Sequence, residues 1–433
     1  MLKIIKDGRV GLLGASTLVG IVFLEKERRR RELSSWIDVF RGDDALHSIL
    51  GEQRYKLFSE IDRALSALTL SLESSIRPEN LRYPLIVNAG LLGLMQRQNV
   101  EEIKKKKKLR DQDWKQGAER NLLLASAAYG AAMCTVLDMM PPPPQLVKDD
   151  CHSLEETDVS LSLAAMCQGA KKLCFVNCDT GVPLHFIVRD KQGQLCLVIR
   201  GTRSFDDAAS DLAAMPVKAN ELGDAVYVHA GMRAAAKRVL DGPAGKFLLE
   251  AQETKIVITG HSLGAGLATL VALEIARRRP QICIECFAFA PPPVASNLQI
   301  IPNNCSVLAF IHGNDCVPSL SLHSVAHLLL QLARIDALPL DAHSRLRILA
   351  TYDVDALKAA LESTDQNLSL YFDAQQCSSD DLLQLYVVAS TAFHLHKDGS
   401  FSNFNNKLVP SIQFHPRMVI DHFPNHYVSV FQQ

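Results

Sequence analysis

A single serine lies between a strand-like run and a helix-like run in the second half of this chain. Residues 255–266 read KIVITGHSLGAG, an apolar and β-branched run that leads into Gly-His-Ser-Leu-Gly. Residues 267–279 are rich in Ala and Leu and are predicted to form a helix that ends before Pro280. Glycines two residues before and two residues after Ser262 permit a turn that is too tight for larger side chains. This strand–turn–helix context is typical of a nucleophile elbow, which presents the serine hydroxyl at the edge of a sheet.

Composition excludes a few classes of protein. The chain has 433 residues, of which 48% are hydrophobic, so it can bury a large core without disulfide bonds. Its formal net charge of −1 argues against a general attraction to nucleic acid. Its eleven cysteines are scattered and odd in number, which favours reduced core residues in a protein that faces the cytoplasm. Cys283 and Cys286 have CxxC spacing, but no second pair lies at zinc-finger distance, so two strand residues are the preferred interpretation.

The N-terminal residues 1–35 combine an apolar run with a basic flank. Val10–Leu24 is uncharged and apolar, and Glu25–Arg31 follows it with most of the positive charge. The run is shorter than the about 20 residues of a full membrane span, and no small-residue cleavage site follows it. Because the basic flank should stay in the cytoplasm, we predict a membrane anchor with the catalytic domain on the cytoplasmic side. A transit peptide and a buried helix are the alternatives.

Residues 36–118 are predicted to form a helical extension before the main domain. Ile49–Leu72 carries apolar residues at a spacing of three to four, and Leu81–Met95 is a second apolar segment. Lys104–Lys108 is a basic run that suits either a solvated helix face or attraction to anionic lipid headgroups. The main domain is predicted to occupy residues 119–433.

The first strands of the main domain end beside a possible oxyanion donor. Three strand-like runs, at 172–178, 184–189 and 194–200, are separated by turn residues and form a hairpin pattern. The third run leads directly into Gly201 and Thr202. A glycine and a small hydroxyl residue at the end of a strand suit the second donor of an oxyanion hole. We therefore expect the backbone N–H groups of Thr202 and Leu263 to bind the oxyanion.

The acid and the base of a triad are expected after the serine. In an elbow of this type the chain order is Ser, then Asp or Glu, then His. Asp315 follows the strand-like run at 306–311 on a glycine-containing loop, so it is the predicted acid. His422 is the predicted base, behind a predicted final strand at 409–414. His426 is the reserve candidate, and His415 lies too close to that strand to reach across easily.

Together these motifs resemble the class 3 lipases, a group of alpha/beta-hydrolases. The resemblance covers roughly residues 120–433. Four segments carry it, namely Arg200–Thr202, His229–Met232, Gly260–Gly266 and Asp421–Tyr427. Within the family, the sn-1-specific diacylglycerol lipases are the most similar, because of the Asp-His-x-Pro-x-x-Tyr ending and the hydrophobic N-terminal region. The resemblance implies a mostly parallel central sheet flanked by helices, an oxyanion residue at Thr202, and a triad of Ser262, Asp315 and His422.

The spacing of the predicted acid and base indicates an insert. Asp315 and His422 are about 107 residues apart, and the resemblance implies that members of this family without an insert need roughly half that. We therefore expect an insert at about 321–402 near the active site, with helices at 326–337, 346–361 and 382–393. Its Leu-rich faces suit a lid that opens at lipid, and a static helical cap is the alternative.

The resemblance implies a function as well as a fold. It implies a serine hydrolase that cleaves fatty acyl esters of membrane glycerolipids, most closely a diacylglycerol or acylglycerol lipase, through a covalent acyl-enzyme and without a cofactor or metal. The implied partners are a membrane lipid substrate and a membrane surface, not nucleic acid. A phospholipase A1 or a general carboxylesterase would use the same site. An inactive membrane-associated lipid-binding scaffold is the alternative of another class, but a scaffold needs none of the three triad residues. Because the base must be a neutral imidazole, activity is expected to fall below about pH 6–7.

Overall fold

A computed structural model gives the structure of this protein. It describes residues 82–83, 85–101, 114–142, 154–177, 182–202, 216–223, 225–363, 383–404, 412–415 and 417–433. These residues fall into two compact units. The larger unit contains the central sheet and the serine, and the smaller unit is made of helices from two distant parts of the chain.

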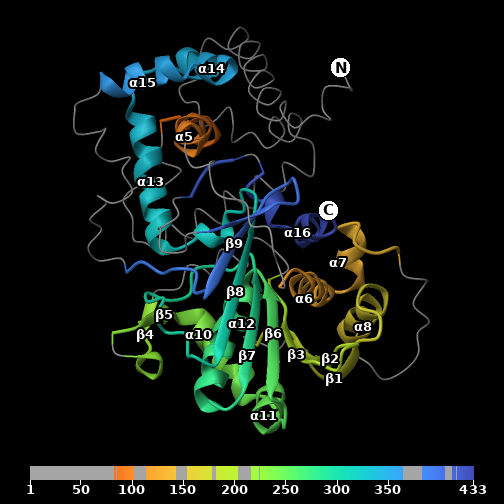
Figure 1. Ribbon diagram of the computed structural model, residues 1–433. Coiled ribbons are helices and arrows are strands. Elements are labelled where there is room, and N and C mark those ends of the chain that lie inside the picture. The colour runs from red at the N-terminus through yellow and green to blue at the C-terminus, as the bar shows by residue number, and fades with distance from the viewer. Residues whose placement is uncertain are drawn as a thin grey trace. The chain divides into compact units, whose positions relative to one another are not determined.

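The larger unit is built on an eight-stranded sheet in the order β1-β2-β3-β6-β7-β8-β9-β10 (Figure 1). Its strands are β1 Lys171–Val176, β2 His185–Arg189, β3 Leu195–Ile199, β6 Lys255–His261, β7 Cys283–Phe289, β8 Cys305–His312, β9 Thr391–Leu395 and β10 Phe401–Asn403. All pairs from β3 to β9 are parallel, whereas β1, β2 and β3 pair antiparallel and β10 pairs antiparallel with β9. The predicted hairpin pattern and the mostly parallel sheet are therefore confirmed.

Helices cover both faces of this sheet. Along β6, the side chains of Ile256 and Ile258 join a core with α10, α11 and α12, while Val257 between them joins a core with α6, α8 and α16. Because successive strand residues point to opposite faces, a strand covered on both sides is apolar on both faces, as β3 is over its whole length and as β6 is at residues 256–258. The helices are α6 Lys115–Ala127, α7 Ala131–Val136, α8 Leu154–Met166, α10 Ala230–Asp241, α11 Pro243–Glu250, α12 Leu263–Arg278 and α16 Pro424–Phe431.

Short elements complete the larger unit. A two-stranded antiparallel sheet pairs β4 (Pro216–Lys218) with β5 (Tyr227–His229). Among the described residues of this unit, 3₁₀ turns lie at η4 Asn220–Leu222, η5 Val317–Ser319 and η7 Ile420–His422. The turn η5 follows the predicted acid, Asp315, and the turn η7 contains the predicted base, His422. Both turns therefore belong to the loops of the candidate site.

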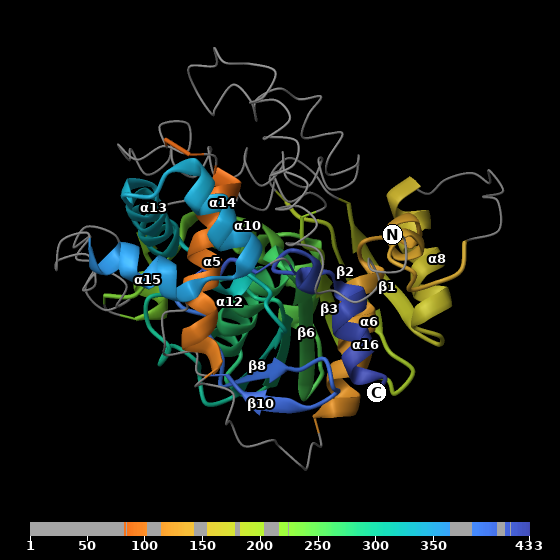
Figure 2. The same ribbon diagram turned by 90° about the horizontal axis from the view of Figure 1, so that it is seen from above.

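The smaller unit joins the N-terminal extension to part of the expected insert. It contains α5 (Leu85–Glu101), α13 (Leu322–Ala337) from its second residue onward, α14 (Ala342–Thr351) and α15 (Val354–Glu362). Helix α5 packs against α14 and α15 (Figure 2). At Gly90 a Cβ would come within 2.9 Å of the Leu349 side chain, so the absence of a side chain lets α5 and α14 approach closely.

A fully buried arginine holds this unit together. The Arg345 guanidinium donates hydrogen bonds to the backbone carbonyls of residues 335, 336, 338 and 340 at the end of α13, and to the Asn88 side chain at 3.1 Å. Its guanidinium carbon also lies 3.9 Å from the centre of the Tyr83 ring. The Asp336 carboxylate accepts hydrogen bonds from the backbone N–H groups of residues 82 and 83 and from the Asn88 amide. The guanidinium N–H groups therefore supply donors to carbonyls at the helix end that would otherwise be buried without a hydrogen bond.

We expect Arg345→Met to destabilise the smaller unit by about 3 kcal/mol or more, because several buried carbonyls lose their donor. The exposed Arg347 on the same helix supplies the control, since Arg347→Met should change stability by about 0.5 kcal/mol or less. Hydrogen exchange of peptides from α5 and α14 in the full chain measures the effect. Equal protection of these peptides in the two variants would contradict the stabilising role of Arg345 in the smaller unit.

Two expected elements differ from the structure. The predicted helix at 382–393 is wrong, because residues 383–390 are largely irregular and residues 391–395 form β9, which pairs with β8. Its apolar run is buried on both sides, and a short apolar run does not reveal by its periodicity whether it is a strand or a helix. The predicted strand at 409–414 is wrong over residues 412–414, which are irregular, and the rest of it lies outside the described residues. The expected helices at 326–337 and 346–361 correspond to α13 and to α14 with α15.

The predicted anchor lies outside the residues that the structure describes. Within those residues, no helix combines the length and the apolar character that a membrane crossing requires. The domain boundaries at 35, 118, 321 and 402 remain predictions, although residues 391–403 of the expected insert belong to the central sheet.

Candidate active site

Ser262 occupies a strained turn at the carboxyl end of the central sheet. It connects β6 to α12 with φ 59° and ψ −132°, a backbone region that residues with a side chain rarely adopt. Its N–H donates to the Phe289 carbonyl at the end of β7, at 2.9 Å. A Cβ on Gly260 would collide with the Gly264 carbonyl, and one on Gly264 would collide with the Ile199 carbonyl. The two glycines therefore allow β3, β6 and α12 to meet around the serine, as a nucleophile elbow requires.

The structure brings the three predicted triad residues together. The His422 Nε2 atom lies 2.9 Å from the Ser262 hydroxyl oxygen, and the His422 Nδ1 atom lies 3.0 Å from each carboxylate oxygen of Asp315. All three residues are buried, with exposed fractions of 3% for Ser262, 7% for Asp315 and 9% for His422. Since a carboxylate only accepts hydrogen bonds, the Nδ1 atom carries the proton and Nε2 is left to accept from the serine hydroxyl.

Asp315 is held as a carboxylate by its neighbours. Burial alone would raise the pKa of Asp315, but the His422 ring and hydrogen bonds from His422, Tyr427 and the Val317 N–H outweigh it and lower that pKa. The Tyr427 hydroxyl on α16 donates to Asp315 Oδ2 at 2.5 Å and accepts from the His312 N–H at 3.0 Å. Burial, followed by the Asp315 carboxylate, raises the pKa of Tyr427, whose hydroxyl therefore stays protonated as a donor.

This carboxylate should make stability depend on pH in one direction. A pKa that is lower in the folded state stabilises the fold above the unfolded value of about 4, and that contribution disappears as the pH falls through the folded pKa. We therefore expect the free energy of unfolding of wild type to exceed that of Asp315→Asn at pH 7 and the difference to shrink below about pH 4. Urea titrations at several pH values measure the difference. A gap that widens toward acid pH would show that Asp315 is buried as a neutral acid.

The predicted oxyanion residues flank the serine. A Cβ on Gly201 would lie 3.2 Å from the Ser262 Cβ, so the backbone that enters Thr202 runs beside the nucleophile. Leu263 is the first residue of α12, where backbone N–H groups have no partner within the helix. The two predicted donors thus come from the end of β3 and the start of α12, on either side of Ser262.

Two residues beside the triad, His261 and Tyr129, were not predicted from the sequence as part of the site. His261 directly precedes the serine, and its Nε2 atom lies 2.8 Å from the His422 backbone carbonyl while its Nδ1 atom lies 2.9 Å from the Tyr129 hydroxyl. Burial, followed by the neighbouring His422, lowers the pKa of His261 to about 3, so its ring is neutral and donates to that carbonyl through Nε2. Tyr129 follows an Ala- and Leu-rich helix that gives no sign of a site.

His426, the reserve candidate, and His229, which belongs to one of the family segments, take other positions. His426 stacks on His312, with 6.2 Å between ring centres, and the serine hydroxyl is bonded to His422 instead. His229 caps α10 by accepting a hydrogen bond from the Met232 N–H at 3.2 Å, which is a structural role. Among the triad candidates, only His422 is brought to the serine within the described residues.

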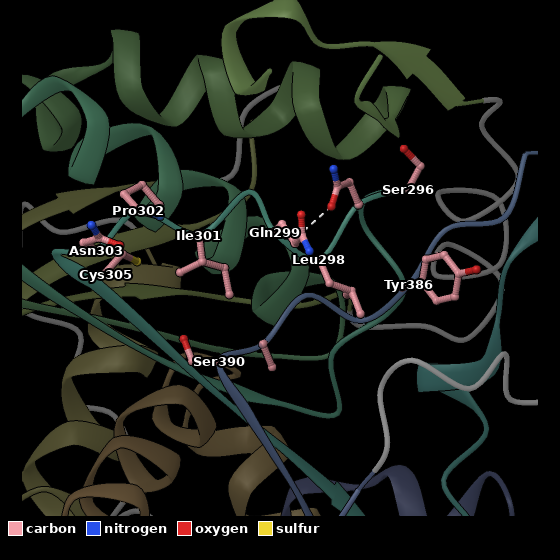
Figure 3. Close-up of a pocket in the computed structure, with 11 residues that line it drawn as sticks. Ser296, Leu298, Gln299, Ile301, Pro302, Asn303, Cys305, Tyr386 and Ser390 are labelled. Carbon is pink, nitrogen blue, oxygen red and sulfur yellow. Dashed lines mark hydrogen bonds between the residues drawn. The ribbon is translucent and has the colours of Figure 1, made fainter. Parts of the chain in front are cut away.

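A cavity of about 690 Å³ lies away from the triad (Figure 3). It is lined by residues 296–305 and 386–390, at the ends where β8 and β9 begin. Because β6, β7, β8 and β9 are parallel, this is the opposite edge of the sheet from the serine. Its lining carries no charged residue, and burial raises the pKa of the Cys305 thiol to about 12, so that thiol stays protonated.

Comparison with known proteins finds lipases that are similar to part of this chain. Residues 196–325 match the family model "Lipase (class 3)". The resemblance to the class 3 lipases is confirmed. Mouse diacylglycerol lipase-beta is 30% identical over 165 residues, which are 36% of this chain and 24% of that protein. The lipase of Rhizopus niveus is 30% identical over 143 residues, which are 30% of this chain and 35% of that protein. Human diacylglycerol lipase-alpha is 26% identical over 241 residues, which are 50% of this chain and 22% of that protein.

Solved lipase structures are similar at lower identity. The lipase of Rhizopus microsporus var. chinensis aligns with a TM-score of 0.38 and 20% identity over 49% of this chain and 70% of that chain. Lipase II of Rhizopus niveus aligns with a TM-score of 0.38 and 22% identity over 49% of this chain and 77% of that chain. The segment at 196–325 that matches the family model contains the elbow and Asp315, and the parallel sheet with helices on both faces has the alpha/beta-hydrolase architecture. The chain spans between about a fifth and about a third of the length of the curated relatives that it matches.

Proposed function

We propose that this protein is a serine hydrolase that cleaves carboxylic esters, with Ser262 as nucleophile, His422 as base and Asp315 as the residue that orients the base. The observation that carries the proposal is the continuous chain of contacts from the Ser262 hydroxyl through the His422 ring to the Asp315 carboxylate, at 2.9 Å and 3.0 Å. A scaffold without chemistry has no need for a buried carboxylate and a buried imidazole aligned on a strained serine.

In the proposed mechanism, His422 Nε2 takes the proton of Ser262 while the serine oxygen attacks the ester carbonyl carbon. The backbone N–H groups of Leu263 and Thr202 bind the oxyanion, and loss of one such donor typically lowers turnover by about 10²–10³. Collapse of the tetrahedral intermediate expels the alcohol, which receives the proton from His422, and leaves an acyl-enzyme. His422 then removes a proton from water, whose attack releases the acid and restores Ser262.

The substrate that we propose is a fatty acyl ester of a membrane glycerolipid, most closely a diacylglycerol. Two observations support an apolar substrate. The relatives that match this chain are named as diacylglycerol lipases and as lipases. Ile420 and Phe423, on either side of the buried pair Asp421 and His422, are 36% and 38% exposed and suit contact with an acyl chain.

A substrate panel tests this choice. Purified full-length protein in mixed micelles should release fatty acid from diacylglycerol faster than from a phospholipid or a short-chain nitrophenyl ester. Preference for the phospholipid would favour a phospholipase A1, and preference for the short ester would favour a general carboxylesterase. No hydrolysis of any of the three by folded protein would favour the lipid-binding scaffold.

We further propose that residues 1–35 anchor the protein on a membrane with the catalytic domain facing the cytoplasm. The support is the apolar run with its basic C-terminal flank. Deletion of residues 1–31 should release the protein from membranes and leave hydrolysis of a soluble short-chain ester unchanged within about two-fold. Membrane pelleting that persists after the deletion would contradict the anchor.

A further inference from the structure

The candidate triad depends on two separate loops. Asp315 follows β8, and His422 lies in η7 shortly before α16, 107 residues further along the chain. The His422 ring stays within 3.0 Å of both Asp315 and Ser262 only if the two loops keep one relative position. Apart from the triad contacts themselves, something must hold these loops together.

The residues immediately before the acid and the base are bonded to each other. Asp421 is fully buried, and its Oδ2 atom accepts hydrogen bonds from the Asn314 N–H at 3.0 Å and from the Asn314 side-chain amide at 3.2 Å. Its Oδ1 atom accepts from Arg417 Nε at 2.8 Å, an ion pair within its own loop. One carboxylate therefore bridges the acid loop and the base loop.

The backbone around this bridge is shaped for it. Gly313 has φ +53°, and a Cβ there would lie 2.5 Å from Asp421 Oδ2, so a larger residue would push the carboxylate away. The Asp421 carbonyl lies 3.1 Å from His312 Nδ1, and the Cys316 N–H donates to the Met418 carbonyl at 3.2 Å. These contacts join the same two loops on both sides of the bridge.

The carboxylate is charged in this position. Burial would raise the pKa of Asp421, but the Asn314 N–H, Arg417, His312 and Lys397 outweigh it and lower that pKa. A charged acceptor holds its donors more strongly than a neutral one. Removal of the charge should therefore loosen the bridge even when the shape of the side chain is kept.

We propose that Asp421 is a positioning residue that fixes the distance between Asp315 and His422 by clamping the two loops that carry them. The proposal rests on the proposed hydrolase function and goes beyond it, because the Asp421 carboxylate bonds to Asn314 and Arg417 and would act on the reaction only through the position of His422. Together with the hydrogen bond from His261 to the His422 carbonyl, it holds the backbone of the base from both sides.

The test uses the full-length protein and a fluorophosphonate probe that reacts with an activated serine. Asp421→Asn should lower the labelling rate and kcat by about 10–10²-fold and leave KM within about two-fold, because a displacement of about 1 Å is enough to misalign a reacting group. Asp241→Asn, an exposed carboxylate at the end of α10, is the matched control and should match wild type.

A second background separates positioning from general damage. In a His422→Ala protein, Asp421→Asn should change the residual labelling rate by less than about two-fold, because a residue that acts through His422 has nothing left to position. If Asp421→Asn does not fold, Asn314→Ala removes one of the three donors and should lower kcat by several-fold.

The two possible failures are distinguishable. Wild-type protein that neither labels nor hydrolyses any ester overturns the proposed function. Active wild type with an Asp421→Asn rate equal to that of Asp241→Asn, or an equal loss in the His422→Ala background, overturns the positioning role.

Discussion

Replacement of Ser262 by alanine is expected to lower the rate of ester hydrolysis by about 10⁶-fold, because the nucleophile and the covalent route are lost together. Ser262→Ala should stay folded, since among the described residues the hydroxyl bonds to His422 and the backbone turn is kept. Ser429 on α16 supplies the control, because its hydroxyl donates to the His426 carbonyl of its own helix. Hydrolysis by Ser429→Ala should equal that of wild type, and substantial hydrolysis by Ser262→Ala would place the chemistry elsewhere.

The backbone conformation of Ser262 should also affect the free energy of unfolding of variants at this position. Ser262 is held at φ 59°, where a Cβ is strained and glycine is not. We expect Ser262→Gly to be more stable than Ser262→Ala by about 1 kcal/mol, although both are inactive. Thermal unfolding of the two variants side by side measures the difference, and a less stable glycine variant would argue against stored strain in the elbow.

Replacement of Asp315 by asparagine is expected to lower kcat by about 10⁴-fold, with the fold preserved. An amide can hydrogen-bond to the His422 ring in an orientation that favours the wrong tautomer, and it no longer stabilises the imidazolium that forms during the reaction. The asparagine keeps one side-chain oxygen, so only one of the two donors that now serve separate carboxylate oxygens, the Val317 N–H on Oδ1 and the Tyr427 hydroxyl on Oδ2, keeps its acceptor in the variant. Steady-state kinetics with a short-chain ester measure the effect.

The control for this variant is a carboxylate of similar burial outside the triad. Asp190, 6% exposed, accepts hydrogen bonds from backbone N–H groups in the turn between β2 and β3. Asp190→Asn should affect stability more than the rate of hydrolysis. A kcat for Asp315→Asn within ten-fold of wild type would show that the acid of the site is another group.

The elbow was predictable because its signal is local. A buried strand, two glycines at fixed positions and an Ala-rich helix occur in one continuous stretch, and they predict the turn without knowledge of the rest of the chain. Asp315 and His422 were predictable as candidates because parallel strands end at one edge of the sheet and the triad order is fixed. Their actual distance from Ser262 depends on packing and needed the structure.

The remaining features depend on contacts between distant segments. Nothing in the sequence near Asp421 indicates that it bonds to Asn314, since the two are separated by 107 residues. Likewise, the hydrogen bond between Arg345 on α14 and Asn88 on α5 joins two residues that are 257 positions apart in the sequence. The helix expected at 382–393 failed for a different reason, because an apolar run of this length fits a buried strand equally well.

The most direct test is to label the full-length protein with a fluorophosphonate and to locate the adduct by peptide mass spectrometry. We expect a single adduct on Ser262 in wild type, none in Ser262→Ala, and strongly slowed labelling in His422→Ala and Asp315→Asn. Folded wild-type protein that stays unlabelled, or an adduct on another residue, would contradict the claim that these three side chains form one catalytic unit.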